Sequence, residues 1–320
     1  MAPLDTLLAC VLALREDDIP LWLMLVAPPG SGKTEMLMTL AGLTQPYVKM
    51  VSKVTPQTFV SGWTMGGKIK GSLLDRIPSR CVVVLKDFTT CLTMRSEARR
   101  EVLGQLREIY DGSINADYGT GEGVAWNGKL CVLAGVTEAI DSVSSYEQQL
   151  GERFLTIRLR PADRRATALK ALRNSAKEAA LKRALAFATQ AALSAERPAA
   201  GEVAFPEWRQ EQVASLADFV SVARTTPTRD ARTYQITGAA ESEGPSRLAR
   251  QFGLLVRALA ALRGRREIAD ADLRTARRVG FDSLVPKRRK VLEAITHLED
   301  DGSGVTTEAV ARVMGIGRGS

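Results

Sequence analysis

The chain has 320 residues, of which 45% are hydrophobic and 25% charged, and its formal net charge of +8 comes entirely from residues 161–320. Four cysteines without CxxC spacing and a single histidine argue against a zinc site, and the lack of an apolar run of bilayer length predicts a cytoplasmic protein without a membrane partner. The basic second half favours a polyanionic partner, most simply nucleic acid.

The first strong local pattern is an apolar run, a glycine-rich turn and a helix. A helix is expected over residues 3–16, and the apolar run 21–26 then predicts a short buried strand. The loop Ala27-Pro28-Pro29-Gly30-Ser31-Gly32-Lys33-Thr34 leads into a helical pattern over 33–43. Strand, glycine-rich loop and helix in this order are what a phosphate-binding P-loop requires, although Ala27 stands where the first glycine of GxxxxGK[ST] is usual.

The residue types of this loop match the chemistry of a nucleoside triphosphate. Gly30 and Gly32 would let backbone amides approach phosphate oxygens, where a side chain would block them. Lys33 would reach the β- and γ-phosphates, and the Thr34 hydroxyl would bind Mg²⁺. The sequence therefore predicts ATP and Mg²⁺ as cofactors. The expected contact residues are Pro29, Gly30, Ser31, Gly32, Lys33, Thr34 and Glu35.

Four more strands are expected in the first half, because short apolar runs alternate there with helical and turn-rich patterns. Apolar side chains recur on one side of a helix over 97–110, and residues 111–127, rich in Gly, Asp and Asn, predict a hairpin. Strands alternating with helices predict an α/β fold, a three-layer αβα sandwich with a parallel sheet. The strands are expected at 47–54, 81–85, 130–134 and 154–159.

The strand at 81–85 is followed by Lys86-Asp87, and an acidic strand end is what a nucleoside triphosphatase needs to hold Mg²⁺ and polarise water. Two registers are open. In one, Asp87 is the magnesium-side carboxylate and Phe88 takes the position of the usual catalytic Glu. In the other, Asp87 is the general base and Lys86 takes the magnesium position. The four apolar residues before the pair favour the second register, whereas repulsion between Lys86 and Mg²⁺ favours the first.

Three more polar residues have expected catalytic roles. Thr137, at the tip of the strand 130–134, is expected to orient the attacking water. Arg153 is expected to project from the surface and neutralise transition-state charge at the nucleotide of a neighbouring subunit. Arg247 lies in the first turn of a predicted helix, where a basic side chain is unfavourable unless an anion faces it.

Beyond Pro161 the strand signals stop and helices are expected. Thr306 would cap the last of them and Gly315 would end it. The last two helices predict a partial helix-turn-helix, because its recognition helix would begin near Ser320. The helices are expected at 163–193, 206–224, 246–263, 270–284, 288–298 and 307–314. The expected domains are an ATPase core at 1–160, a helical lid at 161–285 and the partial helix-turn-helix at 286–320.

These residues together resemble the AAA+ ATPase family over residues 1–284, with a sensor-1-like Thr137, a finger-like Arg153 and a sensor-2-like Arg247. The resemblance implies a ring, most often a hexamer, with ATP bound between subunits and hydrolysis moving loops in a central pore. Two motifs are most similar to those of the minichromosome-maintenance-type helicase branch and related phage or mobile-element ATPases. They are Gly151-Glu152-Arg153-Phe154 and Ser246-Arg247-Leu248.

Two segments are candidates for pore-facing loops. Trp63, Lys68 and Lys70 share a glycine-rich stretch, in which an aromatic ring and lysines could stack on and track single-stranded nucleic acid. Packing of Trp63 beneath its own loop fits the same pattern equally well. The hairpin at 111–127 is the other candidate, and it contains no basic residue.

Three functions are compatible with these features. The basic second half and the partial helix-turn-helix favour an ATP-driven DNA translocase, helicase or replication-initiation motor of a phage or mobile element. A AAA+ protein remodeller would use DNA binding only for recruitment. A nucleotide-gated DNA-binding switch with weak turnover would explain Lys86 in the acidic strand end.

Overall fold

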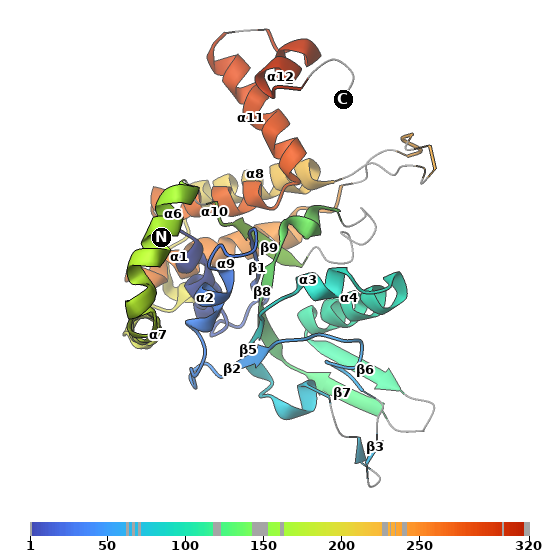
Figure 1. The fold of residues 1–320 in the computed structure, drawn as a ribbon, viewed down its shortest axis with the longest axis vertical. Helices are drawn as coiled ribbons and strands as arrows, with labels where there is room; N and C mark the ends of the chain where they lie inside the picture. Colours follow the sequence, from blue (N-terminus) through green and yellow to red (C-terminus); the bar gives the residue numbers. More distant parts are fainter. Residues whose placement is uncertain are drawn as a thin grey trace.

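A five-stranded parallel sheet is the centre of the computed structural model (Figure 1). Its strands lie in the order β2 (Val48–Val51), β5 (Arg80–Leu85), β8 (Lys129–Val136), β1 (Trp22–Val26) and β9 (Phe154–Arg158). The predicted α/β fold with a parallel sheet is therefore confirmed. The structure describes residues 2–61, 64–65, 68–69, 72–117, 123–142, 153–160, 163–225, 230, 232–233, 235–238, 242–302 and 304–316.

The sheet is buried on both faces. Successive side chains of each strand point to opposite sides, and each side packs into its own hydrophobic cluster. In β5, Val82 and Val84 belong to one hydrophobic cluster, while Val83 and Leu85 belong to another. The second cluster includes side chains of α3 (Thr89–Leu92) and α4 (Ser96–Tyr110). The first cluster includes side chains of α1 (Ala2–Ala13), α2 (Lys33–Met38), α8 (Glu207–Arg224), α9 (Ser246–Leu262) and α10 (Asp270–Asp282). Helices on both faces make the fold compatible with a three-layer sandwich.

The helix expected over 33–43 is shorter in the structure, where α2 ends at Met38. Thr39 Oγ1 donates to the Met36 carbonyl at 2.7 Å, and the next amides donate to carbonyls three residues back instead of four. These tight turns keep the apolar side chains on the core side without extending the α-helix. Gly42, with φ 85°, then turns the chain toward β2.

Two antiparallel hairpins extend from the sheet at the lower end of Figure 1. β6 (Ser113–Asp117) pairs with β7 (Gly123–Asn127), which confirms the hairpin predicted at 111–127. β3 (Thr64–Met65) pairs with β4 (Lys68–Ile69) and is followed by the 3₁₀ turn η1 (Leu74–Arg76). A second 3₁₀ turn, η2 (Glu138–Ser142), follows β8.

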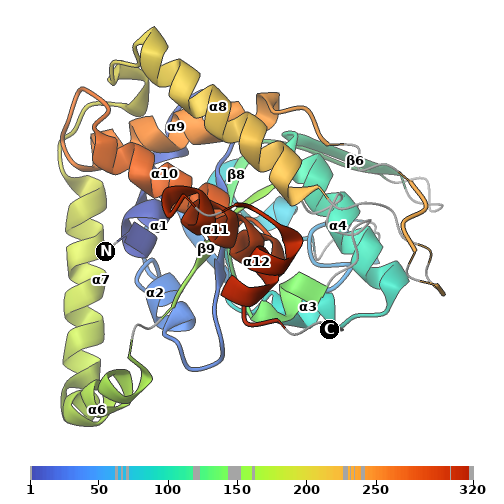
Figure 2. The same ribbon diagram turned by 90° about the horizontal axis from the view of Figure 1, so that it is seen from above.

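Helices make up most of the described chain after β9, as predicted. α8 and α10 pack on α9, which itself packs on α1 (Figure 2). α6 (Arg164–Asn174) and α7 (Glu178–Ser194), joined by η3 (Ser175–Lys177), lie along the outside of the body next to α2 (Figures 1 and 2). The short turn η4 (Ala200–Glu202) connects them to α8. Among the helices of the described ranges, none combines the length and the apolar character needed to cross a bilayer.

The last two helices, α11 (Pro286–Asp300) and α12 (Thr307–Val313), stand out from the body at the top of Figure 1. Thr306 caps α12 as predicted, its Oγ1 accepting a hydrogen bond from the Ala309 amide at 3.1 Å. Gly315, with φ 66°, follows α12 in the left-handed conformation that ends helices.

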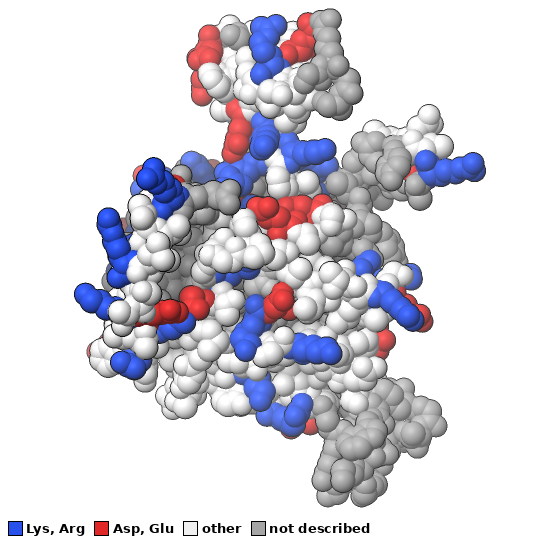
Figure 3. All heavy atoms as spheres, in the orientation of Figure 1, with Lys and Arg blue, Asp and Glu red and all other residues white. Residues whose placement is uncertain are grey.

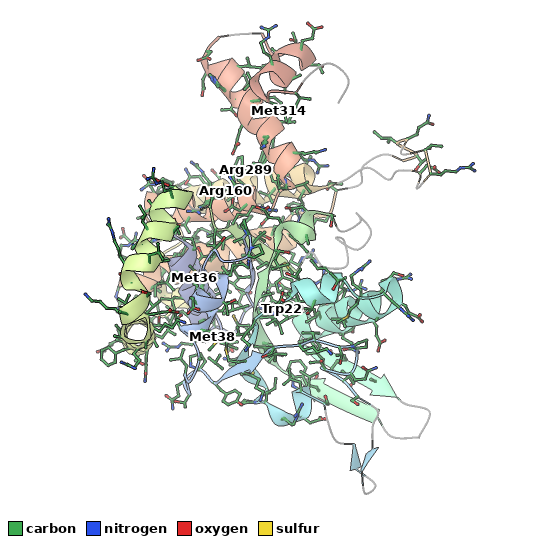
Figure 4. All side chains as sticks on the ribbon, in the orientation of Figure 1. Trp22, Met36, Met38, Arg160, Arg289 and Met314 are labelled. Carbon is green, nitrogen blue, oxygen red and sulfur yellow. The ribbon has the colours of Figure 1, made fainter. Side chains whose placement is uncertain are left out.

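Asp282, whose side chain is 3% exposed, is one of the residues that join α11 to the body. The Asp282 carboxylate accepts a hydrogen bond from the Arg158 amide at 3.0 Å and pairs with Arg289 of α11. The Arg158 guanidinium in turn holds Asp141 of η2 at 2.6 and 2.8 Å. Arg160 and Arg289 lie near one another where α11 meets the body (Figure 4). The carboxyl edge of the sheet is therefore linked to α11 across the expected boundary at residue 285.

Candidate functional site

The candidate site lies at the carboxyl edge of the sheet, where three neighbouring strands end. β8 lies between β1 and β5, with Val26 level with Val136 and Leu85 level with Ala134. Because the strands are parallel, the segments that follow them all emerge at the same edge. The glycine-rich loop (residues 27–32) after β1 is therefore brought beside Asp87 and Thr137.

The glycine-rich loop has the backbone conformation that its glycines were expected to permit. Gly30 has φ 74° and Gly32 has φ 81°, values that L-residues rarely adopt. A Cβ built on either glycine would meet no atom within 4 Å, so the space above the loop is open. Pro29, Gly30, Gly32 and Thr34 are exposed, and Ser31 is half-buried.

Lys33 bends back over this loop. Its Nζ donates to the Ala27 carbonyl at 2.5 Å and to the Pro28 carbonyl at 3.0 Å. Burial lowers the pKa of this ammonium, and the negative charges of Asp87 and Glu138 oppose that shift. A cation held by carbonyls and facing two carboxylates can transfer its hydrogen bonds to an anionic ligand that enters the loop.

Hydrogen bonds tie the end of β5 to the end of β8. Thr89 donates its amide to Asp87 Oδ1 at 3.0 Å, and its hydroxyl donates to Thr137 Oγ1 at 3.4 Å. The Thr137 amide donates to Thr89 Oγ1 at 3.0 Å. Thr89 therefore fixes the exposed carboxylate of Asp87 relative to the Thr137 hydroxyl, and sequence patterns alone did not single it out.

The two strand ends also approach closely through their backbones. The Phe88 amide donates to the Gly135 carbonyl at 2.7 Å. A Cβ on Gly135 would lie 2.8 Å from the Lys86 carbonyl oxygen, closer than real side chains come to backbone. Only glycine therefore permits this spacing of β5 and β8.

The neighbours of Asp87 differ in character. Phe88 is fully buried and packs on Phe154, with ring centroids 6.1 Å apart, whereas Lys86 is half-buried. Neither supplies a second carboxylate to the acidic strand end. An acidic side chain does come from the next strand end, since exposed Glu138 directly follows Thr137 and its charge acts on Lys33. Its position after a strand-end threonine was the signal that could have identified it.

The donor set fits Mg²⁺, which binds to one or two carboxylates together with the phosphates of a substrate. Thr34 offers a hydroxyl in the first turn of α2, and Asp87 offers an exposed carboxylate across the loop. Within the described residues, no group of three or more His, Cys, Asp and Glu side chains could hold a metal without such a ligand. Thr34 and Asp87 would therefore hold Mg²⁺ together with a bound phosphate.

Arg153 lies at the opposite, amino edge of the sheet, since it directly precedes β9. Its side chain was expected to project from the surface, but it is 14% exposed. It pairs with Asp111 at 3.3 Å, and its guanidinium lies 5.5 Å from the centre of the Tyr110 ring. Packing against α4 and the turn after it explains why it does not project.

Arg247 lies at this amino edge as well, in the first turn of α9. Its guanidinium pairs with Glu243, and its charge acts on Tyr110, although burial is the main reason that the pKa of Tyr110 is raised to about 12. One turn along α9, Gln251 Nε2 donates to Tyr110 Oη at 2.9 Å and to the Arg153 carbonyl at 2.9 Å. The structure thus groups Arg153 with Arg247 and separates both from Lys33 by the length of the strands, roughly 16 Å.

The residues expected to contact nucleic acid are placed only in part. Trp63 and Lys70 lie outside the described residues. Lys68 is the first residue of β4, but its side chain is outside what the structure describes. In Figure 1 the β3–β4 hairpin lies at the end of the molecule opposite α11 and α12.

Comparisons with known proteins give no family for this chain, so its function is inferred from the geometry of the site. No protein-family model matches the chain, and no curated protein is significantly similar to it in sequence.

Proposed function

We propose that the chain binds and hydrolyses ATP with Mg²⁺ as a AAA+-type P-loop ATPase. The single observation that carries the proposal is the position of β8 between β1 and β5, which gathers Lys33, Asp87 and Thr137 at one edge. An open glycine-rich loop, a lysine, a carboxylate and a hydroxyl in this order are the groups that phosphoryl transfer requires.

Each residue has a proposed part in the reaction. The amides around Gly30 and Gly32, together with Lys33, hold the phosphates, and Thr34 and Asp87 hold Mg²⁺. Bound Mg²⁺ supplies neutralisation of the charge that develops on the phosphates. Thr137, fixed by Thr89, orients the attacking water. A proton from that water passes to a carboxylate oxygen of Glu138, because Asp87 is bound to Mg²⁺ in this assignment.

The arginines favour an assembly of several subunits. Arg153 and Arg247 lie at the amino edge and therefore cannot reach a phosphate held by Lys33 of the same chain. A neighbouring copy whose amino edge meets this carboxyl edge would bring them to it, as in the proposed homo-oligomeric ring, most simply a hexamer. The transition-state charge would then be neutralised from the neighbouring subunit.

DNA is the proposed substrate along which the motor acts. Lys and Arg exceed Asp and Glu only in residues 161–320, and basic side chains are visible over α6 and α7 and at the base of α11 (Figure 3). Such charge favours phosphate contacts, whose contribution falls as salt rises. A DNA translocase, helicase or initiation motor is the role that combines this charge with ATP hydrolysis.

A nucleotide-gated switch with weak turnover is the second candidate. The residues on either side of Asp87 favour this candidate. Lys86 and the buried Phe88 carry no carboxylate, so the end of β5 supplies only Asp87 to the site. Such a protein would bind ATP tightly and hydrolyse it slowly.

Steady-state ATP hydrolysis, measured with and without single-stranded and duplex DNA at low and moderate salt, tests the proposal. We expect hydrolysis that requires Mg²⁺ and is stimulated by DNA, with less stimulation at higher salt. Hydrolysis indifferent to DNA would favour protein remodelling. Binding without hydrolysis would favour the switch, and the absence of nucleotide binding would overturn the proposal.

A further inference from the structure

The helices α6 and α7, with η3 between them, form a basic arm (residues 164–194) on the outside of the molecule (Figures 2 and 3). The arm contains seven Lys and Arg residues but a single acidic residue, Glu178. This segment alone therefore carries six of the eight net positive charges of the chain. Such a concentration of one sign of charge favours binding to a polyanion.

The basic arm keeps its helical form with little help from the hydrophobic core. Alanine, the strongest helix former, occupies eleven of its positions. Among the side chains that the structure describes in the arm, only Thr189 and Leu193 of α7 are buried. The Leu193 carbonyl accepts a hydrogen bond from Arg15 at 2.9 Å, which fixes the end of α7 to the body. Most of the arm's surface is therefore left over for contacts with a partner.

The two sides of α7 differ in character. One side faces the body across a cleft of about 740 Å³, of which α2 forms the opposite wall. Leu181 and Leu185 line this cleft, whereas Arg183 and Phe187 do not. Arg183 and Phe187 are four residues apart and therefore neighbours on the helix surface. Phe187 is 75% exposed, so the outer side of α7 presents an aromatic ring next to a guanidinium.

The cations of the basic arm also differ from many other arginines of the second half. Arg209 of α8, for example, pairs with Asp270 at 2.7 Å, so its charge is neutralised within the chain. In the described part of the arm, Lys182 is the one cation paired with a carboxylate, and it contacts Glu35 and Glu178. A cation without such a partner gives up no ion pair when it binds phosphate. The exposed cations of this kind are Arg165, Lys170, Arg173, Lys177 and Arg183.

The arrangement of these side chains fits single-stranded nucleic acid better than a lipid surface. A helix that lies on a bilayer presents an apolar stripe opposite its charged side. In α7, Leu181 and Leu185 face the cleft, and the exposed ring of Phe187 shares a side with Arg183 instead. An exposed ring beside cations is the combination that stacks on a base while the cations follow the phosphates.

We infer that the outer side of the basic arm binds single-stranded DNA. Arg173, Lys177 and Arg183 contact phosphates, and the ring of Phe187 stacks on a base. The inference rests on the proposed function for the choice of DNA as the polyanion. It adds the surface that DNA contacts, which is separate from the stretch around Trp63 where the sequence predicted such contacts.

The test is fluorescence anisotropy of the full chain with a labelled single strand and with the duplex of the same sequence. No nucleotide is added, so that the result does not depend on the proposed ATP site. We expect Arg173→Gln/Lys177→Gln/Arg183→Gln to weaken binding of the single strand about 100-fold at about 0.1 M salt. The slope of log K against log salt should become shallower by about 2, because three phosphate contacts are lost.

The matched control removes three exposed cations outside the arm, in the variant Lys53→Gln/Arg274→Gln/Arg277→Gln. Its net charge equals that of the arm variant, so a loss of affinity common to both reflects overall charge alone. We expect the control to bind the single strand nearly as the unmodified chain does. Equal losses in the two variants would overturn the inference. Thermal unfolding checks that both variants remain folded.

Phe187→Ala tests the stacking contact. It should weaken binding of the single strand about tenfold and leave binding of the duplex unchanged, because paired bases do not offer their faces to a side chain. Leu172→Ala, which removes a 73% exposed side chain of α6, is the control. Unchanged affinity of the Phe187 variant for the single strand would overturn the assignment to single-stranded DNA. Binding to phosphatidylserine vesicles that depends on the arm, without DNA binding that depends on it, would assign the arm to a membrane instead.

ATP hydrolysis separates failure of this inference from failure of the proposed function. We expect the arm variant to hydrolyse ATP without DNA as the unmodified chain does and to lose its stimulation by DNA. Stimulation that persists in the arm variant would place the DNA elsewhere, which overturns the inference and leaves the proposed function intact. If the unmodified chain does not bind ATP, the proposed function fails, whereas DNA binding that depends on the arm would still support the inference.

Discussion

The two edges of the parallel sheet hold their polar side chains in different ways. At the carboxyl edge, Lys33 is held by two backbone carbonyls and Asp87 by one backbone amide, and the space above the glycine-rich loop is open. At the amino edge, Arg153 and Arg247 each face an acidic side chain and lie around the buried ring of Tyr110.

This difference separates the arginines from the other residues that the sequence predicts for the site, because Arg153 and Arg247 lie at the edge opposite Lys33, Asp87 and Thr137. The carboxyl edge can receive an anion with only a change of hydrogen-bond partners at Lys33. The amino edge can deliver its arginines only if Asp111 and Glu243 release them, which an approaching anion of a second subunit would favour. In the proposed function, the first edge binds phosphate, and the second supplies positive charge to a neighbouring subunit.

The largest expected effect is at the carboxyl edge. Lys33→Ala should abolish nucleotide binding and hydrolysis, because the loop loses its only side-chain cation toward the phosphates. Fluorescent-nucleotide binding and phosphate release measure the two effects. Lys53→Ala, which removes an exposed lysine after β2, is the control and should behave as the unmodified chain. Retained hydrolysis in Lys33→Ala would remove the glycine-rich loop from the site.

At the amino edge, Arg153→Ala should reduce hydrolysis about 10³-fold and leave nucleotide binding nearly unchanged. Mixing this variant with Lys33→Ala should raise hydrolysis above that of either alone, because some contacts between copies then combine an intact Arg153 with an intact Lys33. No gain on mixing would contradict the proposed role of Arg153 at the nucleotide of a neighbouring subunit. Arg277→Ala, which removes an exposed arginine of α10, is the control.

A smaller loss is expected from Gln251→Leu, which leaves the shape of the side chain similar but removes the donor to Tyr110 and to the Arg153 carbonyl. Misplacing Arg153 in this way should lower hydrolysis by up to about 10²-fold. The free energy of unfolding should fall by about 1 kcal/mol. Hydrolysis that is unchanged while stability falls would show that Gln251 has a structural role alone.

The smallest effect concerns pH. Burial raises the pKa of Tyr110 from 10.0 to about 12, so the folded chain retains a proton there that the unfolded chain releases. This contribution to stability is complete below pH 10 and is lost as the pH rises toward 12, by about 1–2 kcal/mol. In denaturant titrations between pH 9 and 11.5, Tyr110→Phe should therefore lose less stability than the unmodified chain. If the stabilities of the two proteins fell equally with pH, the raised pKa of Tyr110 would be contradicted.

The strands of the parallel sheet and most helices could be predicted from the sequence because their patterns are local, whereas the short strands β3 and β4 lie in a stretch expected to be a loop. The apolar run after Arg80 is typical of a strand buried on both faces, and Thr306 and Gly315 mark the two ends of α12. The end of α2 was missed, because apolar spacing continues past Met38 while the hydrogen bonds change to those of a tighter turn.

The candidate site was predictable to a lesser degree. Strand ends identified Asp87 and Thr137, but the order of strands, which decides that they meet, is set by packing between distant segments. The pairing of Arg153 with Asp111 depends on how α4 ends, and the cleft depends on how α6 and α7 fold back along α2. Such contacts leave no periodic signal in the sequence.

The close approach at Gly135 has a consequence for mutational tolerance. The polar residues of the site are the obvious positions at which a substitution would reduce activity. Gly135 is a less obvious one, because it has no side chain. An added methyl group would meet the Lys86 carbonyl at 2.8 Å and force β5 away from β8. Asp87 and Thr137 would then move apart without being changed themselves. Gly135→Ala, conservative in chemistry, is therefore expected to be among the least tolerated substitutions in the sheet.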